Sequence, residues 1–313
     1  MIKQIYSLLG YNYKKASQKQ KNDAYIELCN ICNAKCIFCP YPEIAKSNKK
    51  LQNMSEEIFD NVLLYLKKLN IKNISFTPTT GEILLNKDWN NYLQKALNED
   101  SFERIHFYSN AILLNKQNIE RILNLTNIQK LKRISFSVGG IDTTSYLNMY
   151  KVDKFNKVKE NINNLNQKLK KINSNIKITC EFRLPKNISK INKNELYNTF
   201  NTHSYSNFEI DIMSKFANID FMEASSNEIN FLKKPVYTTP CIDLNTYRFA
   251  VNGDIWLCGC VVSELPNDTS LKIGNIFDSS YKEILKNQNK IIKNWDTIIP
   301  LVCQNCDIYT PRK

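Results

Sequence analysis

Ten cysteines in a chain of 313 residues are the feature that most limits what this sequence can fold into. Four of them lie close together near the N-terminus, five lie in the last quarter of the chain, and Cys180 alone lies between the two groups. In a small secreted protein this count would indicate disulfides, whereas in a cytosolic chain of this length metal or redox chemistry is the better interpretation. The two groups therefore predict two metal sites.

Composition and charge exclude several classes of protein. No apolar run reaches the roughly 18 residues of a membrane-spanning helix, and the first residues lack the apolar core and cleavage site of a secretory signal. We therefore predict a cytoplasmic protein with no membrane partner. The formal net charge is +13, but its lysines are spread along the chain. This distribution favours solvated helix faces over a nucleic-acid-binding surface.

The first two thirds of the chain alternate between strand-like and helix-like segments. Short strands rich in Ile, Phe and Tyr are expected at Ala24–Leu28, Asn73–Pro78, Arg104–Ser109, Arg133–Val138, Lys177–Leu184 and Phe208–Met213. Helical periodicity follows Ser55 and recurs at Trp89–Leu97, Lys116–Leu125 and Phe155–Ile172. Six strands alternating with helices predict an α/β fold with a parallel sheet, either open or partly closed into a barrel.

A different pattern begins after about residue 220. Tyr247–Val251 and Asp254–Cys258 flank Asn252-Gly253, a strong hairpin signal, and a helix is expected from about Ser279. This segment is predicted to be a small cysteine-bearing module appended to the α/β domain. We accordingly divide the chain into an N-terminal extension (1–23), a core domain (24–220) and a C-terminal module (221–313).

Three cysteines of the first group have a spacing suited to a cluster. Cys32, Cys36 and Cys39 lie on one short loop directly after the first strand. Three thiolates can hold three irons of a cubane cluster and leave the fourth iron open for an external ligand. A structural zinc ion normally takes four closed ligands. Cys29 could supply the fourth, so zinc remains an alternative at this point.

This loop, with its CxxxCxxC spacing and Phe38 before the last cysteine, resembles the radical S-adenosylmethionine (radical SAM) superfamily. The resemblance implies a partial (β/α)6 TIM-like barrel in which Cys32, Cys36 and Cys39 bind a [4Fe–4S] cluster. S-adenosylmethionine would chelate the open iron and be cleaved reductively to a 5′-deoxyadenosyl radical. An electron donor of the flavodoxin or ferredoxin type is implied as well. Cys29 stands where many members have Thr or Ser, so it is left out of the ligand set.

The resemblance extends to the ends of later strands. Thr80-Gly81-Glu82 resembles the Gly-Gly-Glu segment that meets the cofactor's methionine amino group, although the first glycine is absent. Ser109-Asn110 resembles the family's Thr-Asn-Gly, and Ser137 matches a serine at the end of the fourth strand. The residues assigned to cofactor binding are Phe38, Thr80, Gly81, Glu82, Ser109, Asn110, Ser137, Glu181 and Arg183.

The fifth strand carries two of these candidates. If Arg183 faces the barrel interior, the period-2 alternation of a strand also directs Glu181 and Thr179 inward and Cys180 outward. A guanidinium group binds a carboxylate through two hydrogen bonds, so Arg183 suits the carboxylate of the cofactor. A surface ion pair is the alternative. Cys180 is expected to be a buried apolar residue.

The second cysteine group resembles the C-terminal modules called SPASM and twitch, in which a hairpin and a helix hold an auxiliary [4Fe–4S] cluster. Cys241, Cys258, Cys303 and Cys306 are the ligands that the resemblance implies, with Cys260 as a spare or substitute. Because a full SPASM module continues with more cysteines, we expect the shorter, twitch-like form with one auxiliary cluster. A zinc ribbon is the alternative.

The function expected is oxidation or epimerisation of a small polar, sugar- or alcohol-like substrate. The twitch-like module resembles that of dehydrogenases in aminoglycoside biosynthesis. In addition, the residues before the first strand are too few to form the peptide-recognition domain that many peptide maturases carry. Glu209 and Asp211 on the sixth strand could contact substrate hydroxyls or serve as a base, or could simply face solvent. A peptide maturase or peptide epimerase is the first alternative. A zinc-dependent nucleic-acid-binding protein is a remote one.

Overall fold

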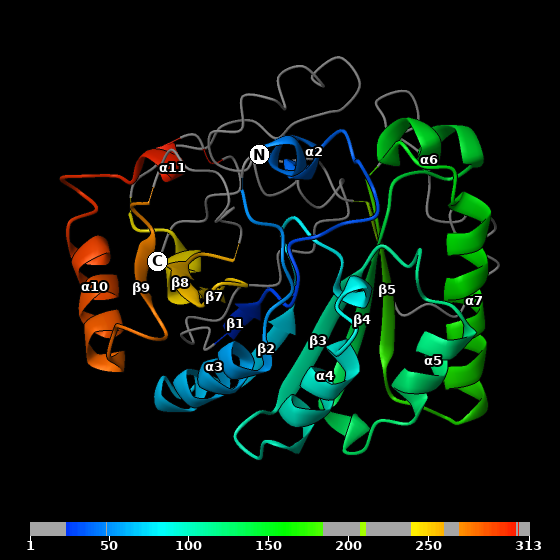
Figure 1. Ribbon diagram of the computed structural model, residues 1–313, viewed down its shortest axis with the longest axis horizontal. Coiled ribbons are helices and arrows are strands. Elements are labelled where there is room, and N and C mark those ends of the chain that lie inside the picture. Colours follow the sequence, from blue (N-terminus) through cyan, green and yellow to red (C-terminus); the bar gives the residue numbers. More distant parts are fainter. Residues whose placement is uncertain are drawn as a thin grey trace, which may run out of the picture.

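The computed structural model is an α/β fold whose central sheet is mostly parallel, consistent with a partial TIM-like barrel (Figure 1). The structure describes residues 23–47, 49–183, 207–210 (backbone only), 239–259, 269–304 and 306. The N-terminal extension, except Asp23, and the proposed boundary near residue 220 therefore lie outside the described residues.

Nine strands form one continuous sheet in the described part of the chain, in the order β6-β5-β4-β3-β2-β1-β7-β8-β9. Strands β1 to β6 are mutually parallel, as the alternating pattern predicts, and β7, β8 and β9 continue the sheet beyond β1. The strands are β1 (Asp23–Ile26), β2 (Asn73–Phe76), β3 (Arg104–Ser109), β4 (Leu131–Val138), β5 (Lys177–Phe182), β6 (Asn207–Ile210), β7 (Tyr247–Phe249), β8 (Asp254–Leu257) and β9 (Lys272–Asn275).

The helices follow the strands in the expected order. They are α2 (Tyr41–Lys46), α3 (Glu56–Lys68), α4 (Trp89–Asn98), α5 (Lys116–Leu123), α6 (Thr143–Tyr150), α7 (Phe155–Lys171), α10 (Tyr281–Lys293) and α11 (Leu301–Gln304), with 3-10 turns η1 (Ile83–Leu85), η2 (Ile128–Lys130) and η4 (Ile242–Asn245). The side chain of Ser55 accepts a hydrogen bond from Ile58 N (3.3 Å) and so begins α3 as predicted. Ser280 begins α10 with a capping box. Sequence analysis did not anticipate α2, α6 and α11.

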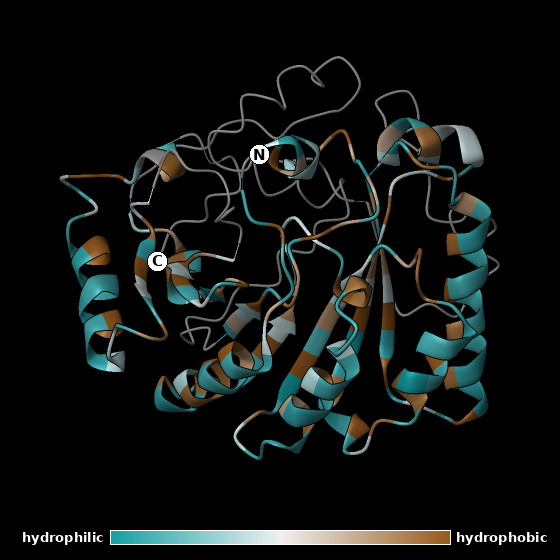
Figure 2. Ribbon diagram, viewed as in Figure 1, coloured by the Kyte–Doolittle hydropathy of each residue, from teal (hydrophilic) through white to brown (hydrophobic). Residues whose placement is uncertain are grey.

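The hydrophobic core lies between the sheet and the helices. The strands bury alternating or continuous apolar residues, as in β2 and β4, and each long helix buries one face. Figure 2 shows this pattern as hydrophobic colour on β3 and β4, while hydrophilic residues predominate on α7 and α10. Cys180 is fully buried within this core, as expected.

The C-terminal module shares the sheet of the barrel instead of forming a separate appendage. Strand β7 pairs in parallel with β1, so that Ala24, Tyr25 and Ile26 lie opposite residues 247–249. The hydrogen bond from Glu27 N to Phe249 O (2.9 Å) continues the pairing beyond the strands. The module thus continues the sheet of the barrel, and its first strand pairs with backbone groups that would otherwise be unpaired at the edge of β1.

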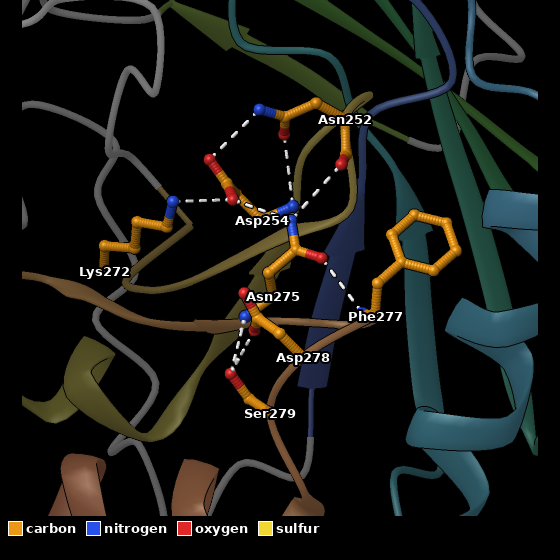
Figure 3. A network of polar contacts seen from close by, with 7 residues as sticks. All are labelled: Asn252, Asp254, Lys272, Asn275, Phe277, Asp278 and Ser279. Carbon is orange, nitrogen blue, oxygen red and sulfur yellow. Dashed lines mark hydrogen bonds and ion pairs between the residues drawn. The ribbon is translucent and has the colours of Figure 1, made fainter.

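The predicted hairpin is present, and a network of polar side chains fixes its turn against β9 (Figure 3). Asn275 donates from Nδ2 to Asp254 Oδ1 (2.9 Å), and its Oδ1 accepts from Phe277 N (3.0 Å). Lys272 Nζ lies 2.7 Å from the same Asp254 oxygen. Gly253 adopts a φ of +84°, a left-handed conformation that favours glycine. The network joins the turn, β9 and the start of α10 into one unit.

None of the helices in the described part of the chain has the length and apolar character needed to cross a membrane.

Candidate functional site

The candidate residues gather at one edge of the parallel sheet. The cysteine loop follows β1, Thr80-Gly81-Glu82 follows β2, and Ser109-Asn110 ends β3. Ser137 is next to last in β4, and Arg183 comes directly after β5. Since the carboxyl ends of parallel strands lie at the same edge of a sheet, the fold brings these segments together where α/β proteins build their sites.

The cysteine loop is held in place by the end of α6. The amides of Lys35 and Ile37 donate to Tyr150 O (3.0 Å) and Met149 O (2.9 Å), so the residues on either side of Cys36 are fixed. The ring of Phe38 meets the ring of Tyr150 edge-on, with centroids 5.6 Å apart. These contacts use carbonyls at the helix C-terminus that have no partner within the helix.

The three thiols lie within electrostatic reach of one another. The pKa of Cys36 is raised well above its usual value, first by burial and then by the charges of Cys39 and Cys32, whereas Arg183 acts in the opposite direction. Burial likewise raises the pKa of Cys32. Metal ligation requires thiolates, and the positive charge of bound iron stabilises them. Among the described residues, no three His, Cys, Asp or Glu side chains are grouped so that they could hold a metal ion.

Cys29 is buried beside this loop, and its sulfur forms hydrogen bonds with the backbone of its near neighbour Ile31. Its Sγ accepts from Ile31 N (3.2 Å) and donates to Ile31 O (3.3 Å). Burial raises the pKa of Cys29 to about 11. The thiol therefore makes the local turn that a serine or threonine hydroxyl makes elsewhere, consistent with leaving it out of the ligand set.

Gly81 brings the segment after β2 against the start of the cysteine loop. A Cβ atom at this position would lie 2.0 Å from Cys29 O, closer than any side chain can approach a backbone oxygen. The next amide, Glu82 N, donates to Ile31 O (2.8 Å). The glycine is required because the two backbones touch here.

Glu82 joins β2 to the end of β3. Its carboxylate accepts hydrogen bonds from Ser109 Oγ (2.7 Å), Asn110 N (2.7 Å) and Leu84 N (3.1 Å). Burial raises the pKa of Glu82, although these three donors act to lower it. Three of the assigned cofactor-binding residues are thereby brought into contact.

Asn110 extends this group to the cysteine loop. Its Nδ2 donates to Asn33 Oδ1 (2.7 Å) and lies 3.8 Å from Cys32 Sγ, within the range of a weak hydrogen bond to sulfur. Its Oδ1 accepts from Ile112 N (3.0 Å), which fixes the orientation of the amide. Asn110 can thus donate to a cluster ligand without rearrangement.

Arg183 spans the ends of β4 and β5. Its Nη1 donates to Ser137 Oγ (2.8 Å), and its Nη2 lies 3.9 Å from Glu181 Oε2. The guanidinium also covers the ring of Phe38 at 5.4 Å from the centroid. The side chains of Arg183 and Glu181 are only 17% and 12% exposed, so the pair lies inside the site and the surface ion pair considered from the sequence is wrong.

Buried hydroxyls without partners indicate that this site fits a polar ligand. The side-chain oxygens of Thr80, Thr179 and Tyr146 are buried, and none has a hydrogen-bond partner in the described part of the chain. Buried polar groups in native proteins are almost always paired. An S-adenosylmethionine molecule and an iron–sulfur cluster would supply acceptors, so the residues present fit both groups.

The second cysteine group lies on the module that extends the sheet. Cys241 precedes η4, Cys258 follows β8 with a φ of 72°, and Cys303 lies in α11. Cys241, Cys258 and Cys303 pack against the main hydrophobic core. Cys306 N donates to Cys303 O (3.2 Å), which folds the CxxC segment into a turn. Cys260 lies outside the described residues.

The two carboxylates proposed to contact substrate belong to the segment at and after β6. Glu209 belongs to β6, where the backbone register pairs it with Glu181, but its side chain is not described. Asp211 lies outside the described residues.

Sequence analysis missed a buried ion pair between the two cysteine regions. Arg248 Nη1 lies 2.6 Å from Glu27 Oε1, and the same carboxylate oxygen accepts from Thr79 N (3.1 Å). Arg248 Nη2 donates to Gly259 O, next to Cys258. The one available signal was a charged residue, Glu27, directly after an apolar strand.

Comparison with known proteins agrees with this geometry. Residues 26–179 match the family model described as the Radical SAM superfamily. A curated relative, the GTP 3′,8-cyclase of Desulforamulus reducens, is 24% identical over 135 residues, which cover 42% of this chain and 39% of that protein. The chain thus spans well under half the length of this relative.

Several solved structures share the fold. The complex of BtrN with AdoMet and 2-DOIA superposes with a TM-score of 0.58 and 15% identity, covering 93% of this chain and 95% of that one. AdoMet-bound anSMEcpe gives a TM-score of 0.58 at 15% identity, with coverage of 91% and 89%. SuiB of Streptococcus suis bound to the precursor peptide SuiA gives 0.54 at 15% identity, with coverage of 91% and 69%.

The family match covers the cysteine loop and the strand ends through β4, where the candidate cofactor contacts of the first four strands lie, and it ends within β5. Residues 26–179 are therefore similar to a radical SAM superfamily domain.

Proposed function

We propose that the protein cleaves S-adenosylmethionine reductively and removes hydrogen from a small polar substrate, giving oxidation or epimerisation with the help of one auxiliary cluster. The observation that carries the first part is that the loop of Cys32, Cys36 and Cys39 lies at the carboxyl edge of the sheet, where Asn110 contacts Cys32 and the charge of Arg183 acts on Cys36, in a segment that matches the radical SAM family model. When bound, the [4Fe–4S] cluster and S-adenosylmethionine supply a 5′-deoxyadenosyl radical that abstracts hydrogen from a C–H bond.

The chain's own residues bind and orient these groups. Cys32, Cys36 and Cys39 hold the cluster, and Asn110 donates to the sulfur of Cys32. Glu82, buried and held by Ser109, offers negative charge to the cofactor's amino group, while Arg183 offers a guanidinium to its carboxylate.

The proposal of a small polar substrate rests on how much of this chain superposes on the fold of BtrN. Nearly the whole of this chain superposes on nearly the whole of BtrN, whose structure holds 2-DOIA beside AdoMet. We further propose that Cys241, Cys258, Cys303 and Cys306 hold the auxiliary cluster. Glu209 and Asp211 are proposed to contact substrate hydroxyls or to accept a proton. The electron donor is proposed to be of the flavodoxin or ferredoxin type.

A second candidate is modification of a peptide. The structures of anSMEcpe with the Cp18Cys peptide and of SuiB with SuiA favour it, with similar overall folds.

The test is anaerobic reaction with dithionite and S-adenosylmethionine. Wild-type protein should release 5′-deoxyadenosine, and a triple Cys32/Cys36/Cys39→Ala variant should release none while still binding about one cluster. Stoichiometric zinc and a colourless protein would overturn the assignment. Deuterated 2-DOIA should yield deuterated 5′-deoxyadenosine, whereas transfer only from a deuterated peptide would establish the second candidate.

A further inference from the structure

Arg133 on β4 is partly buried, and no ion pair joins it to a carboxylate among the described residues. Its Nη2 donates to the Tyr108 hydroxyl (3.3 Å), while its Nε is buried with no hydrogen-bond partner. Its neighbours in the sheet register are His106 on β3 and Lys177 on β5, so neither flanking strand places an acid beside it. A guanidinium removed from water normally has an anionic partner, because an unpaired buried charge is costly. The unpaired Nε therefore indicates that a bound group supplies the anion.

The guanidinium of Arg133 extends along β4 toward the carboxyl edge of the sheet. Its central carbon lies 5.9 Å from the centroid of the Tyr108 ring, and Tyr108 lies opposite Ser135 in the register. Since alternate residues of a strand share a face, Arg133, Ser135 and Ser137 lie on the same face of β4. The guanidinium thus reaches the level of Ser135, one step below the hydrogen bond between Ser137 and Arg183.

Two hydroxyls at this level are unpaired as well. Ser135 and Thr179 lie opposite each other in β4 and β5, and both are fully buried. Neither side-chain oxygen has a hydrogen-bond partner in the described part of the chain, although buried polar groups are almost always paired. The two hydroxyls and the guanidinium can all donate hydrogen bonds, so the group lacks acceptors and negative charge. A carboxylate or a phosphate supplies both, whereas a water molecule supplies no charge.

We propose that Arg133 and Ser135, with Thr179 beside them, form a subsite for an anionic group of the substrate, a carboxylate or a phosphate. The inference rests on the proposed function and narrows its substrate class to small polar molecules that carry such a group. Two residues of a parallel strand span about 7 Å, which is the separation of Ser135 from Ser137 along β4. A small molecule bridges this distance, so its anion is fixed by Arg133 while its other end reaches the proposed cofactor contacts.

The test measures anion binding to anaerobically reconstituted protein without S-adenosylmethionine. Inorganic phosphate and succinate serve as probes at equal ionic strength, and the rise of Tm with concentration gives the Kd of each. Arg133→Met should raise the Kd of the tighter probe about tenfold or more, and Ser135→Ala should raise it several-fold. Arg104→Met is the matched control, because it removes an exposed arginine at the start of the adjacent strand and should leave the Kd unchanged. The tighter probe distinguishes a phosphate from a carboxylate.

Stability without any anion separates a binding role from a structural one. Arg133→Met should resist urea at least as well as wild type, because the substitution removes a charge that has no partner. A less stable Arg133→Met variant that binds both probes as wild type does would assign the arginine a structural role and overturn the proposal. Ser135→Ala decides the matter if Arg133→Met does not fold.

Two further outcomes overturn the proposal. If neither probe raises the Tm of wild type more than that of Arg133→Met, the three donors bind ordered water only. If S-adenosylmethionine alone binds Arg133→Met more weakly, the guanidinium belongs to the cofactor. Failure of the proposed function is distinguishable, since wild-type protein would then release no 5′-deoxyadenosine, whether or not it binds the probes.

Discussion

The guanidinium of Arg248 and the carboxylate of Glu27 form an ion pair at 2.6 Å in which each side chain is only 1% exposed. Glu27 precedes the cysteine loop, and Arg248 lies in the strand that the C-terminal module adds beside β1. Arg248 also donates to Gly259 O beside Cys258, and Glu27 accepts from Thr79 near the Thr80-Gly81-Glu82 segment. One buried pair therefore connects the surroundings of both proposed clusters.

Breaking this pair should be strongly destabilising. Arg248→Met leaves the Glu27 carboxylate buried without its cation, and a loss of about 3–5 kcal/mol in the free energy of unfolding is expected. A double Glu27→Met/Arg248→Met variant should lose less than the Arg248→Met variant, because it buries no unpaired charge. Urea unfolding under anaerobic conditions measures both. Lys46→Met, which removes an exposed pair with Glu43, is the control and should cost under about 1 kcal/mol. A loss in the double variant that equals the sum of the losses of the Glu27→Met and Arg248→Met single variants would contradict the pairing.

Substitution of Gly81 should disturb the cysteine loop itself. Gly81→Ala forces a methyl group against Cys29 O, where only backbone movement can relieve the contact. We expect a loss of about 3 kcal/mol or more in stability and a lower iron content at the first site, measured by unfolding and by iron analysis. Gly253→Ala is the matched control, because its methyl group meets the flexible side chain of Ile276 and strains only the hairpin turn. Normal iron content in Gly81→Ala would argue against the close contact.

His106 should make stability depend on pH. Burial first, and then the charges of Arg133 and Arg104, lower the pKa of His106 from 6.5 to about 4. As the pH falls from 6.5 to 4, the unfolded chain takes up a proton before the folded protein does, so stability is lost over this interval. The loss should be about 1–3 kcal/mol, since one unit of pKa is 1.36 kcal/mol and the ring is partly exposed.

Unfolding measured at several pH values in this interval checks the prediction with two variants. His106→Gln should remove this part of the pH dependence, so that wild type and variant diverge between pH 4 and 6.5. Arg133→Met should weaken it, because the second cause of the lowered pKa is removed. Parallel curves for wild type and His106→Gln would show that the histidine does not titrate in this way.

Arg183 should contribute to the affinity for S-adenosylmethionine. Its guanidinium is oriented by Ser137 and Glu181. A guanidinium binds a carboxylate through two parallel hydrogen bonds, which require two of the guanidinium nitrogens. Arg183→Met is expected to raise the Kd about tenfold or more, and Arg183→Lys to have an intermediate effect because it keeps charge without the planar fork. Equilibrium binding to reconstituted protein measures this. Arg121→Met, which removes a guanidinium stacked on Trp89, should leave the affinity unchanged.

Local signals were enough to predict most of the elements. The strand Arg104–Ser109 was predicted with its observed bounds, and Ser55 begins its helix, because alternation and capping act over a few residues. Helix α6 was missed because its sequence, TTSYLNMY, shows only weak separation of polar and apolar faces. The C-terminal carbonyls of α6 accept hydrogen bonds from the backbone on either side of Cys36. The eight residues of the helix carry no pattern that could predict these contacts.

Long-range contacts could not be predicted in the same way. The parallel pairing of β1 with β7 depends on segments from opposite ends of the chain, and a charged residue such as Arg248 is expected at the surface unless its partner is known. The spacing of Cys32, Cys36 and Cys39 indicated the first site because all three lie on one loop. The contacts of Glu82 with Ser109 and Asn110 emerged only when the sheet placed β2 beside β3.

The pairing of β1 with β7 also bears on how the protein is made. On the ribosome the cysteine loop emerges early, directly behind the first strand, but the strand that completes this edge is among the last to be synthesised. Until then, β1 can pair only with β2, and the carboxylate of Glu27 lacks its ion-pair partner Arg248. The loop therefore reaches its final surroundings only after translation has passed β7, so we expect stable loading of iron at the proposed first site to follow the synthesis of that strand.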